Sequence, residues 1–210
     1  MRLLSTVLLL ASGALPGAED LPEPPVSWKY PPEMPGASVE VYREVNGNKL
    51  NAYVFTPPQH QASDRRPAVL FFFGGGWKGG TPGQLLPQSL YLAQRGMVAI
   101  PCDYRVLSRQ GVIPQDCLRD AKAAIRWARA NAARLGIDPE RIVAAGESAG
   151  GHLAAATALV PGFEEGAHPE TSSMPNALVL FNPAVLLSPA EGHPGLLSEA
   201  SLASISARTQ

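Results

Sequence analysis

The chain has 210 residues, of which 45% are hydrophobic and 17% are charged, and its formal net charge at pH 7 is −1. This length and apolar content predict one globular domain with a full core, and they exclude an intrinsically disordered chain. With this small net charge, the chain lacks the excess of basic residues that is typical of proteins that bind nucleic acid or acidic membranes. We therefore expect no nucleic-acid partner.

The first 18 residues have the features of a secretory signal peptide. Arg2 precedes an apolar run at 3–11, and small residues follow up to Ala14 and Ala18, near which we expect cleavage. The run is too short to span a bilayer, which takes about 20 apolar residues, although an N-terminal anchor or a buried helix is the alternative. We therefore expect a secreted or periplasmic protein without a stable membrane span after cleavage.

Residues 19–38 are predicted to form a Pro-rich linker. Their dense prolines exclude a helix or a central strand, and Trp28 and Tyr30 are available to pin the segment to the domain. Residues 39–45 alternate apolar and polar side chains, which is typical of a half-buried strand. A turn at 46–48 and a second strand at 50–55 complete an antiparallel hairpin.

The rest of the chain, up to residue 210, is assigned to the same α/β domain. Apolar runs without alternation predict strands that are covered on both faces, and helical patterns separate them. A mostly parallel central sheet with helices on both faces follows from this alternation. The predicted strands are at 68–73, 97–100, 142–145 and 177–181, and the predicted helices are at 82–95, 115–135, 149–160 and 196–205.

The helix at 115–135 carries basic side chains off its apolar stripe, and we interpret these as a solvated exterior rather than a docking face: Arg119, Lys122, Arg126 and Arg129. Cys102 and Cys117 permit one disulfide in an exported protein, but the sequence does not decide whether it forms. No cysteine or histidine has the spacing of a zinc or redox site, so we expect no metal and no cofactor.

The strongest functional motif is RIVAAGESAGGHL at residues 141–153. An apolar strand, a sharp turn at Gly146-Glu147-Ser148-Ala149-Gly150 and a helix are the setting of a nucleophile elbow. The tight turn requires glycine on both sides of Ser148 and lifts the serine hydroxyl clear of the sheet. Ser148 is therefore the predicted catalytic nucleophile, whereas His152, one helical turn later, is expected to be structural.

Three short segments are expected to meet in one site because ligands bind at the carboxyl ends of parallel strands. They are the glycines at 74–76, Asp103-Tyr104-Arg105, and Glu147-Ser148-Ala149. The glycines allow the backbone to approach a substrate closely and offer N–H groups. The Ala149 amide adds a donor at the positive end of the following helix.

These segments resemble the α/β-hydrolases, in particular carboxylesterases of the hormone-sensitive-lipase-like and acetylxylan-esterase-like groups. The resemblance covers roughly residues 39–183. It rests on FFFGGGW (71–77), DYR (103–105), DAKAAIRW (120–127), GIDPERI (136–142), GESAGGHLAA (146–155) and LVLFNP (178–183).

The resemblance implies that Ser148 attacks the carbonyl of a small acyl or acetyl ester, on a small molecule or on a carbohydrate. The backbone N–H groups of Gly75, Gly76 and Ala149 would then hold the oxyanion. It also implies that the Gly loop is braced from below by Tyr104, Arg105 and Asp120. Phe73 stands where the family has a histidine, which predicts the loss of one loop-ordering hydrogen bond.

In this fold the acid and the histidine of the triad follow the serine in the chain. No aspartate follows Asp138, and neither His168 nor His193 follows a recognisable strand. We therefore expect the sequence to represent the N-terminal two-thirds of a hydrolase domain, with an exposed, aggregation-prone sheet edge at 178–181. The alternatives are a truncated, inactive or binding-only chain and, less favoured, a serine peptidase.

Overall fold

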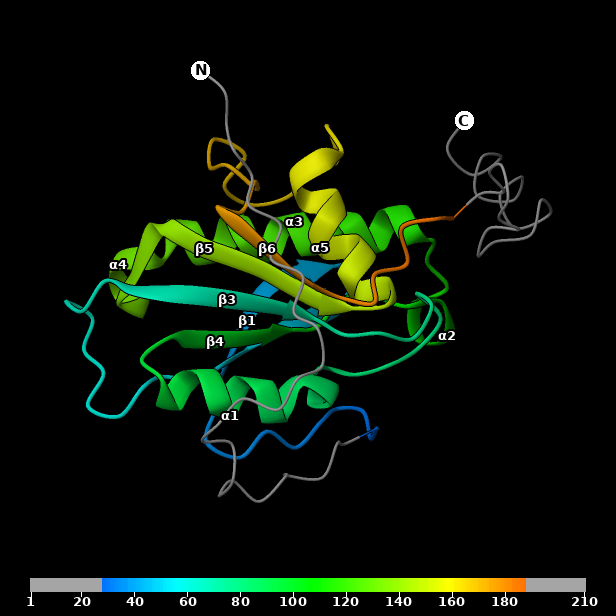
Figure 1. The fold of residues 1–210 in the computed structure, drawn as a ribbon. Coiled ribbons are helices and arrows are strands. Elements are labelled where there is room, and N and C mark those ends of the chain that lie inside the picture. The colour runs from blue at the N-terminus through cyan, green and yellow to red at the C-terminus, as the bar shows by residue number, and fades with distance from the viewer. Residues whose placement is uncertain (1–27, 188–210) are drawn as a thin grey trace.

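The structure is a computed structural model that describes residues 28–187, and it contains one sheet with helices on both faces (Figure 1). The strands lie in the order β1-β2-β4-β3-β5-β6. β1 and β2 form the predicted antiparallel hairpin, β2 is antiparallel to β4, and the remaining neighbours are parallel. The predicted α/β class is confirmed. The strands are β1 (Ser38–Val45), β2 (Asn48–Val54), β3 (Arg66–Phe72), β4 (Val98–Cys102), β5 (Ile137–Glu147) and β6 (Ala177–Phe181).

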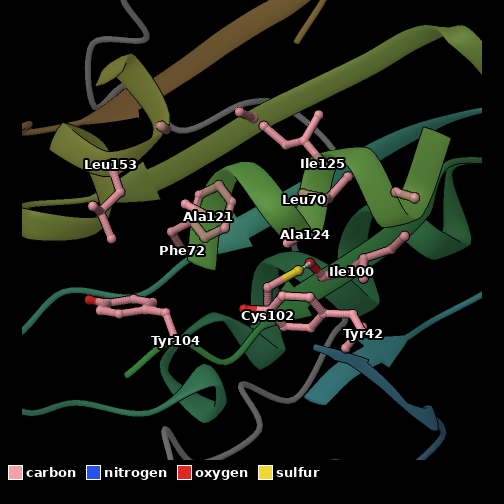
Figure 2. Packing of buried hydrophobic residues seen from close by; sticks show 14 of the residues in the cluster. Tyr42, Leu70, Phe72, Ile100, Cys102, Tyr104, Ala121, Ala124, Ile125 and Leu153 are labelled. Carbon is pink, nitrogen blue, oxygen red and sulfur yellow. Dashed lines mark hydrogen bonds between the residues drawn. The ribbon is translucent and has the colours of Figure 1, made fainter. Parts of the chain in front are cut away.

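The helices divide the core into two layers, with α1 on one face of the sheet and α3 and α5 on the other (Figure 1). Val69 and Phe71 of β3 belong to the layer under α1. Leu70 and Phe72 belong to the layer under α3 and α5 (Figure 2). Both faces of β3 are therefore buried, which explains why its sequence is apolar without alternation. The helices are η1 (Pro82–Leu85), α1 (Leu86–Gln94), α2 (Leu107–Gln110), α3 (Pro114–Ala130), α4 (Ala132–Leu135) and α5 (Ala149–Leu159).

β1 is present as predicted, but two of its valines, Val39 and Val41, do not face the core. Val39 is 56% exposed and Val41 is 48% exposed, whereas Tyr42 is only 5% exposed. The register shifts between Val41 and Arg43, and such a bulge changes which side chains point inward. The buried contact of this strand is instead made by the Tyr42 hydroxyl, which donates a hydrogen bond to the Asp103 carbonyl at 2.6 Å.

The predicted long helix at 115–135 is broken at Asn131, between α3 and α4. The Asn131 side-chain amide donates to the Trp127 carbonyl at 2.9 Å, as short polar side chains do where helices end. The two cysteines are free and buried, so the disulfide that the sequence left open is not formed. Burial raises the pKa of both thiols, of Cys102 and of Cys117, which leaves them as unreactive core residues.

The prediction that all four basic residues of α3 are solvated was wrong for Lys122 and Arg126. These side chains are 1% and 0% exposed. Lys122 Nζ donates to the carbonyls of Val160 and Gly162 at 2.7 and 2.6 Å, and Glu164 pairs with both cations. The segment that follows α5 folds over this part of α3. Helical periodicity gives no information about such a covering loop.

Replacing Glu164 with glutamine is expected to destabilise the protein by about 1–3 kcal/mol, because it leaves two buried cations without their shared carboxylate. This loss of stability is expected to be smaller than for a fully buried ion pair, because the Glu164 side chain is 42% exposed. The measurement is the free energy of unfolding in urea. Glu165→Gln is the matched control, since Glu165 is 62% exposed and should change stability little; equal effects of the two variants would contradict the prediction.

Residues 28–37 contain no helix or strand, and Tyr30 rather than Trp28 holds them to the domain. Trp28 is 69% exposed, whereas the Tyr30 hydroxyl donates to the Asp103 carboxylate at 2.5 Å. Within residues 28–187, no helix has the length and apolar character needed to cross a membrane. The predicted signal peptide at 1–18, linker residues 19–27 and the helix at 196–205 lie outside the described residues.

Candidate active site

The three predicted segments meet at the carboxyl ends of β3, β4 and β5. In the sheet register, Phe72 lies beside Cys102 on one neighbouring strand and beside Gly146 on the other. The chain leaves these strands at the same edge, so the glycine loop, the Asp103 segment and the Ser148 turn are adjacent. The expected convergence is confirmed.

Ser148 occupies a strained, exposed turn between β5 and α5. Its φ is 49° and its ψ is −115°, a conformation that L side chains rarely adopt. A Cβ atom at Gly146 would lie 2.4 Å from the backbone of Gly150, and one at Gly150 would lie 2.0 Å from the Phe72 carbonyl oxygen. Packing of the turn against β3 therefore imposes both flanking glycines, as the sequence predicted.

The glycine loop, residues 74–80, is tightly folded and presents free backbone N–H donors. Gly75 has φ +129°, and a Cβ atom there would lie 2.3 Å from the Gly79 carbonyl oxygen. Gly76 has φ +61° and space around its Cα, and both residues are exposed. Among the described residues, neither amide donates a backbone hydrogen bond. The Ala149 amide is the first in α5 and has no partner within the helix.

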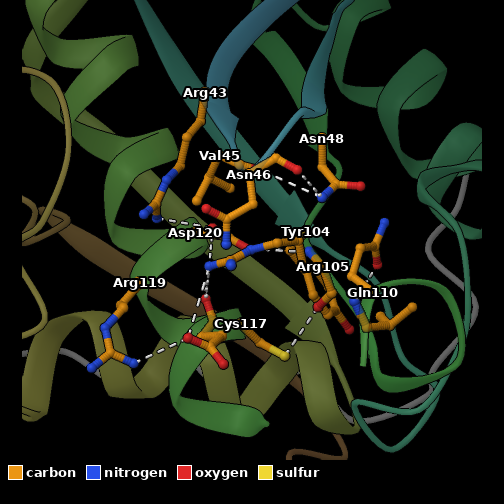
Figure 3. Close-up of polar contacts among 12 residues, drawn as sticks. Arg43, Val45, Asn46, Asn48, Tyr104, Arg105, Gln110, Cys117, Arg119 and Asp120 are labelled. Atoms are coloured by element: carbon orange, nitrogen blue, oxygen red, sulfur yellow. Dashed lines mark hydrogen bonds and ion pairs between the residues drawn. The ribbon is translucent and has the colours of Figure 1, made fainter. Parts of the chain in front are cut away.

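The base of the glycine loop is held by an aromatic pair. The rings of Phe73 and Tyr104 stack with their centroids 3.9 Å apart, and the Tyr104 hydroxyl donates to the Phe73 carbonyl at 2.7 Å. The loop thus keeps an ordering hydrogen bond although Phe73 replaces the family's histidine. Arg105, the residue after Tyr104, forms a bidentate ion pair with Asp120 of α3, with N–O distances of 2.8 and 3.1 Å (Figure 3).

Two contacts around the loop were not predicted from the sequence. Gln84 donates to the Glu147 carboxylate at 3.2 Å, which ties η1 to the residue before Ser148. Gln84 also completes a capping box with Thr81, and the spacing T-x-x-Q at 81–84 was a readable signal for it. Arg109 Nη1 donates to the Gly80 carbonyl at 2.7 Å, but no local pattern marks this contact.

His152 packs behind the turn and not against the Ser148 hydroxyl. Its ring makes an edge contact with Trp77, with centroids 5.2 Å apart, and burial lowers its pKa below the usual value. Within residues 28–187, no histidine or carboxylate forms a hydrogen bond with Ser148 Oγ, and no group of three His, Cys, Asp or Glu side chains could hold a metal ion. His193 lies outside the described residues.

Asp103 links the segment 28–37 to the glycine loop and has an unusual pKa. Burial raises the pKa of Asp103 to about 6, although the Tyr30 hydroxyl and the Arg109 guanidinium both favour the ionised form. The guanidinium also lies over the Tyr30 ring, 3.8 Å from its centroid. Arg109 therefore connects Tyr30, Asp103 and Gly80 in one cluster.

Tyr30→Phe is expected to raise the pKa of Asp103 further, because the carboxylate loses a hydrogen-bond donor. In the wild type, the folded pKa lies above the ordinary value of about 3.9. Protonation of Asp103 therefore adds stability, which is complete below about pH 4 and lost as the pH rises through about 6. Carboxyl NMR titration measures the pKa of Asp103 in the wild type and in Tyr30→Phe, with Tyr91→Phe as the control. A wild-type Asp103 that titrates near 4 would contradict the assignment.

The fold and the arrangement of turn, glycine loop and sheet edge define an α/β-hydrolase. The BD-FAE family model matches residues 53–179. The chain belongs to the BD-FAE family.

Solved structures of Thermogutta terrifontis esterase 2 are similar to this chain. The apo form is 51% identical with a TM-score of 0.77, and the match covers 83% of this chain and 64% of that chain. The form phosphonylated by sarin is 48% identical with a TM-score of 0.78, covering 86% and 66%.

Curated relatives include Carboxylesterase NlhH of Mycobacterium tuberculosis, which is 37% identical over 106 residues, 50% of this chain and 32% of that protein. The probable isoprenylcysteine alpha-carbonyl methylesterase ICMEL1 of Oryza sativa subsp. japonica is 36% identical over 133 residues, 63% and 30% respectively. The chain thus spans about a third of these curated relatives and less than two thirds of the Thermogutta apo structure. The relatives support ester hydrolysis as the general class of reaction.

Proposed function

We propose that this chain carries the nucleophile and the oxyanion-binding loop of a serine carboxylesterase. Ser148 Oγ would attack the ester carbonyl carbon, and its proton would pass to a base while the carbonyl oxygen becomes an oxyanion. Collapse of this intermediate would release the alcohol and leave an acyl group on Ser148. Water would then release the carboxylic acid and restore the serine.

The observation that carries the proposal is the strained, exposed backbone of Ser148 between two glycines that admit no other residue. Strain of this kind persists where the surrounding structure enforces it, and it is concentrated at functional sites. The amides of Gly75, Gly76 and Ala149 are proposed as the donors to the oxyanion. Such a donor typically contributes roughly 3–4 kcal/mol to transition-state stabilisation.

Small acyl esters are the proposed substrates. Thermogutta terrifontis esterase 2 has been solved with propionate bound and with butyrate bound, and phosphorylated by paraoxon. These complexes are of that enzyme, and its identities to this chain of 54%, 49% and 49% support the proposal that this chain also accepts short acyl groups and reacts with organophosphates.

A fluorophosphonate probe tests the nucleophile directly. Peptide mass spectrometry of the labelled full chain should place the adduct on Ser148, and prior treatment with paraoxon should prevent labelling. An adduct on another serine would refute the assignment.

A binding-only chain is the second candidate, because His152, one helical turn after Ser148, packs its ring against Trp77. It predicts saturable binding of butyrate with no labelling at all. Export by a signal peptide at 1–18 remains a separate proposal, which the N-terminal sequence of the mature protein would test.

A further inference from the structure

A second pocket lies away from Ser148, between β1, α3 and the loop at 166–168. Its volume is about 500 Å³. No residue of the glycine loop or of the Ser148 turn lines it. The side chains that give it its chemistry are Val41, Arg43, Val45, Ala123, Trp127 and His168.

The Arg43 guanidinium is the buried cation of this pocket, and its ion pair with Asp120 is made through one nitrogen atom, Nη1. The side chain is only 10% exposed, and Nη1 lies 2.8 Å from Asp120 Oδ1 (Figure 3). Nη1 is buried against Asp120, and among residues 28–187 no group accepts a hydrogen bond from Nε or Nη2. A carboxylate ligand would accept from these remaining N–H groups in charge-assisted hydrogen bonds.

The buried layer beneath this pocket carries a surplus of positive charge. Arg43 and Arg105 share the carboxylate of Asp120, with Asp116 at 4.0 Å from Arg105, and Lys122 and Arg126 share that of Glu164, so four cations face three carboxylates. The four cationic side chains are at most 10% exposed. The surplus favours an anionic ligand. Glu44 also lines the pocket, but its side chain is exposed, and water and salt screen its charge.

Apart from Glu44 and His168, the remaining walls are apolar, and they select the kind of anion. Trp127 and Tyr42 are aromatic lining residues, and Val45 and Ala123 are aliphatic ones. A guanidinium presents a planar fork that matches a carboxylate, and a flat apolar body would pack against Trp127. Inorganic phosphate would leave these walls without contacts.

We propose that this pocket binds a small organic carboxylate with a flat apolar body, its carboxylate on Arg43 and its ring against Trp127. The site does not depend on the reactivity of Ser148.

Titration of benzoate into the full chain tests the proposal by calorimetry and by tryptophan fluorescence. Arg43→Gln should weaken benzoate binding by about tenfold or more, since hydrogen bonds to a charged group are lost. Trp127→Phe should remove the fluorescence change. Arg95→Gln, which removes an arginine near Tyr91 on α1, should bind as the wild type does. Thermal unfolding checks that Arg43→Gln is folded, because Asp120 keeps Arg105.

Val41 offers a second test that does not touch a buried group, because it lines the pocket and is 48% exposed. Val41→Glu should weaken benzoate binding and Val41→Lys should strengthen it. The proposal is overturned if Arg43→Gln binds benzoate as tightly as the wild type, or if benzyl alcohol or inorganic phosphate binds as tightly as benzoate. Ser148→Ala should bind benzoate as tightly as the wild type does. Failure of the proposed esterase activity would therefore leave the outcome of this binding test unaffected.

Discussion

Asp120→Asn is expected to destabilise the protein by about 3–5 kcal/mol, the cost of leaving buried charges without their partner. The carboxylate is fully buried, and it accepts hydrogen bonds from the side chain and the backbone amide of Arg105 at 2.8, 3.1 and 3.1 Å. Arg43 lies 2.8 Å away on its other side. Burial raises the pKa of Asp120 above its ordinary value, but two guanidinium groups at this distance favour the ionised form at neutral pH.

The free energy of unfolding in urea measures this loss. Glu40→Gln is the matched control, since its bidentate pair with Arg134 has similar geometry but side chains that are 29% and 53% exposed. Exposed pairs contribute about 1 kcal/mol or less. If Asp120→Asn proved no more destabilising than Glu40→Gln, the role of this pair in anchoring the chain after β4 to α3 would be wrong.

Ser148→Ala is expected to lower the turnover of p-nitrophenyl butyrate by roughly 10³–10⁶-fold, because loss of a serine nucleophile removes the covalent route. The variant should fold normally, since the Ser148 side chain is exposed and forms no hydrogen bond with the described residues. Initial rates at saturating ester, with unfolding measured in parallel, separate lost chemistry from lost structure.

Ser108→Ala is the control for this experiment. Ser108 is also exposed, and its Oγ lies 3.9 Å from the Cβ position of Gly79 beside the glycine loop. Its replacement should leave turnover unchanged. Turnover that survives in Ser148→Ala would show that another group carries the reaction, whereas a wild type that binds butyrate without turnover would favour the binding-only chain.

The sequence predicted those parts of the fold that are determined by local patterns. The unbroken apolar run at Val69 to Phe72 indicated a strand covered on both faces, and β3 is such a strand. Gly146 and Gly150 indicated a turn without room for side chains, and the distances confirm it. In each case the signal lies within a few residues, because backbone sterics and strand periodicity are local.

Contacts between distant segments were not predicted, because no local pattern records them. Lys122 and Arg126 have the spacing of solvated helix residues, but a loop about 40 positions later covers them. The bulge between Val41 and Arg43 separates the exposed Val39 and Val41 from Val45, which packs against the core. Tyr30 and Asp103, 73 positions apart, meet only in the folded chain.

The sequence by itself determined the family, the mostly parallel sheet and the positions of Ser148, Gly75, Gly76 and Ala149 at one edge of it. These motifs can be recognised in the sequence because the backbone segments pack closely. Only glycine leaves room for such packing, and the serine turn needs a strand before it and a helix after it. The tertiary structure alone decided that the cysteines stay free, that Asp103 joins residues 28–37 to the glycine loop, and that Arg43 lines a pocket while pairing with Asp120. Burial sets the charge state, the hydrogen bonding and the reactivity of these groups, and burial depends on the assembly of the whole fold.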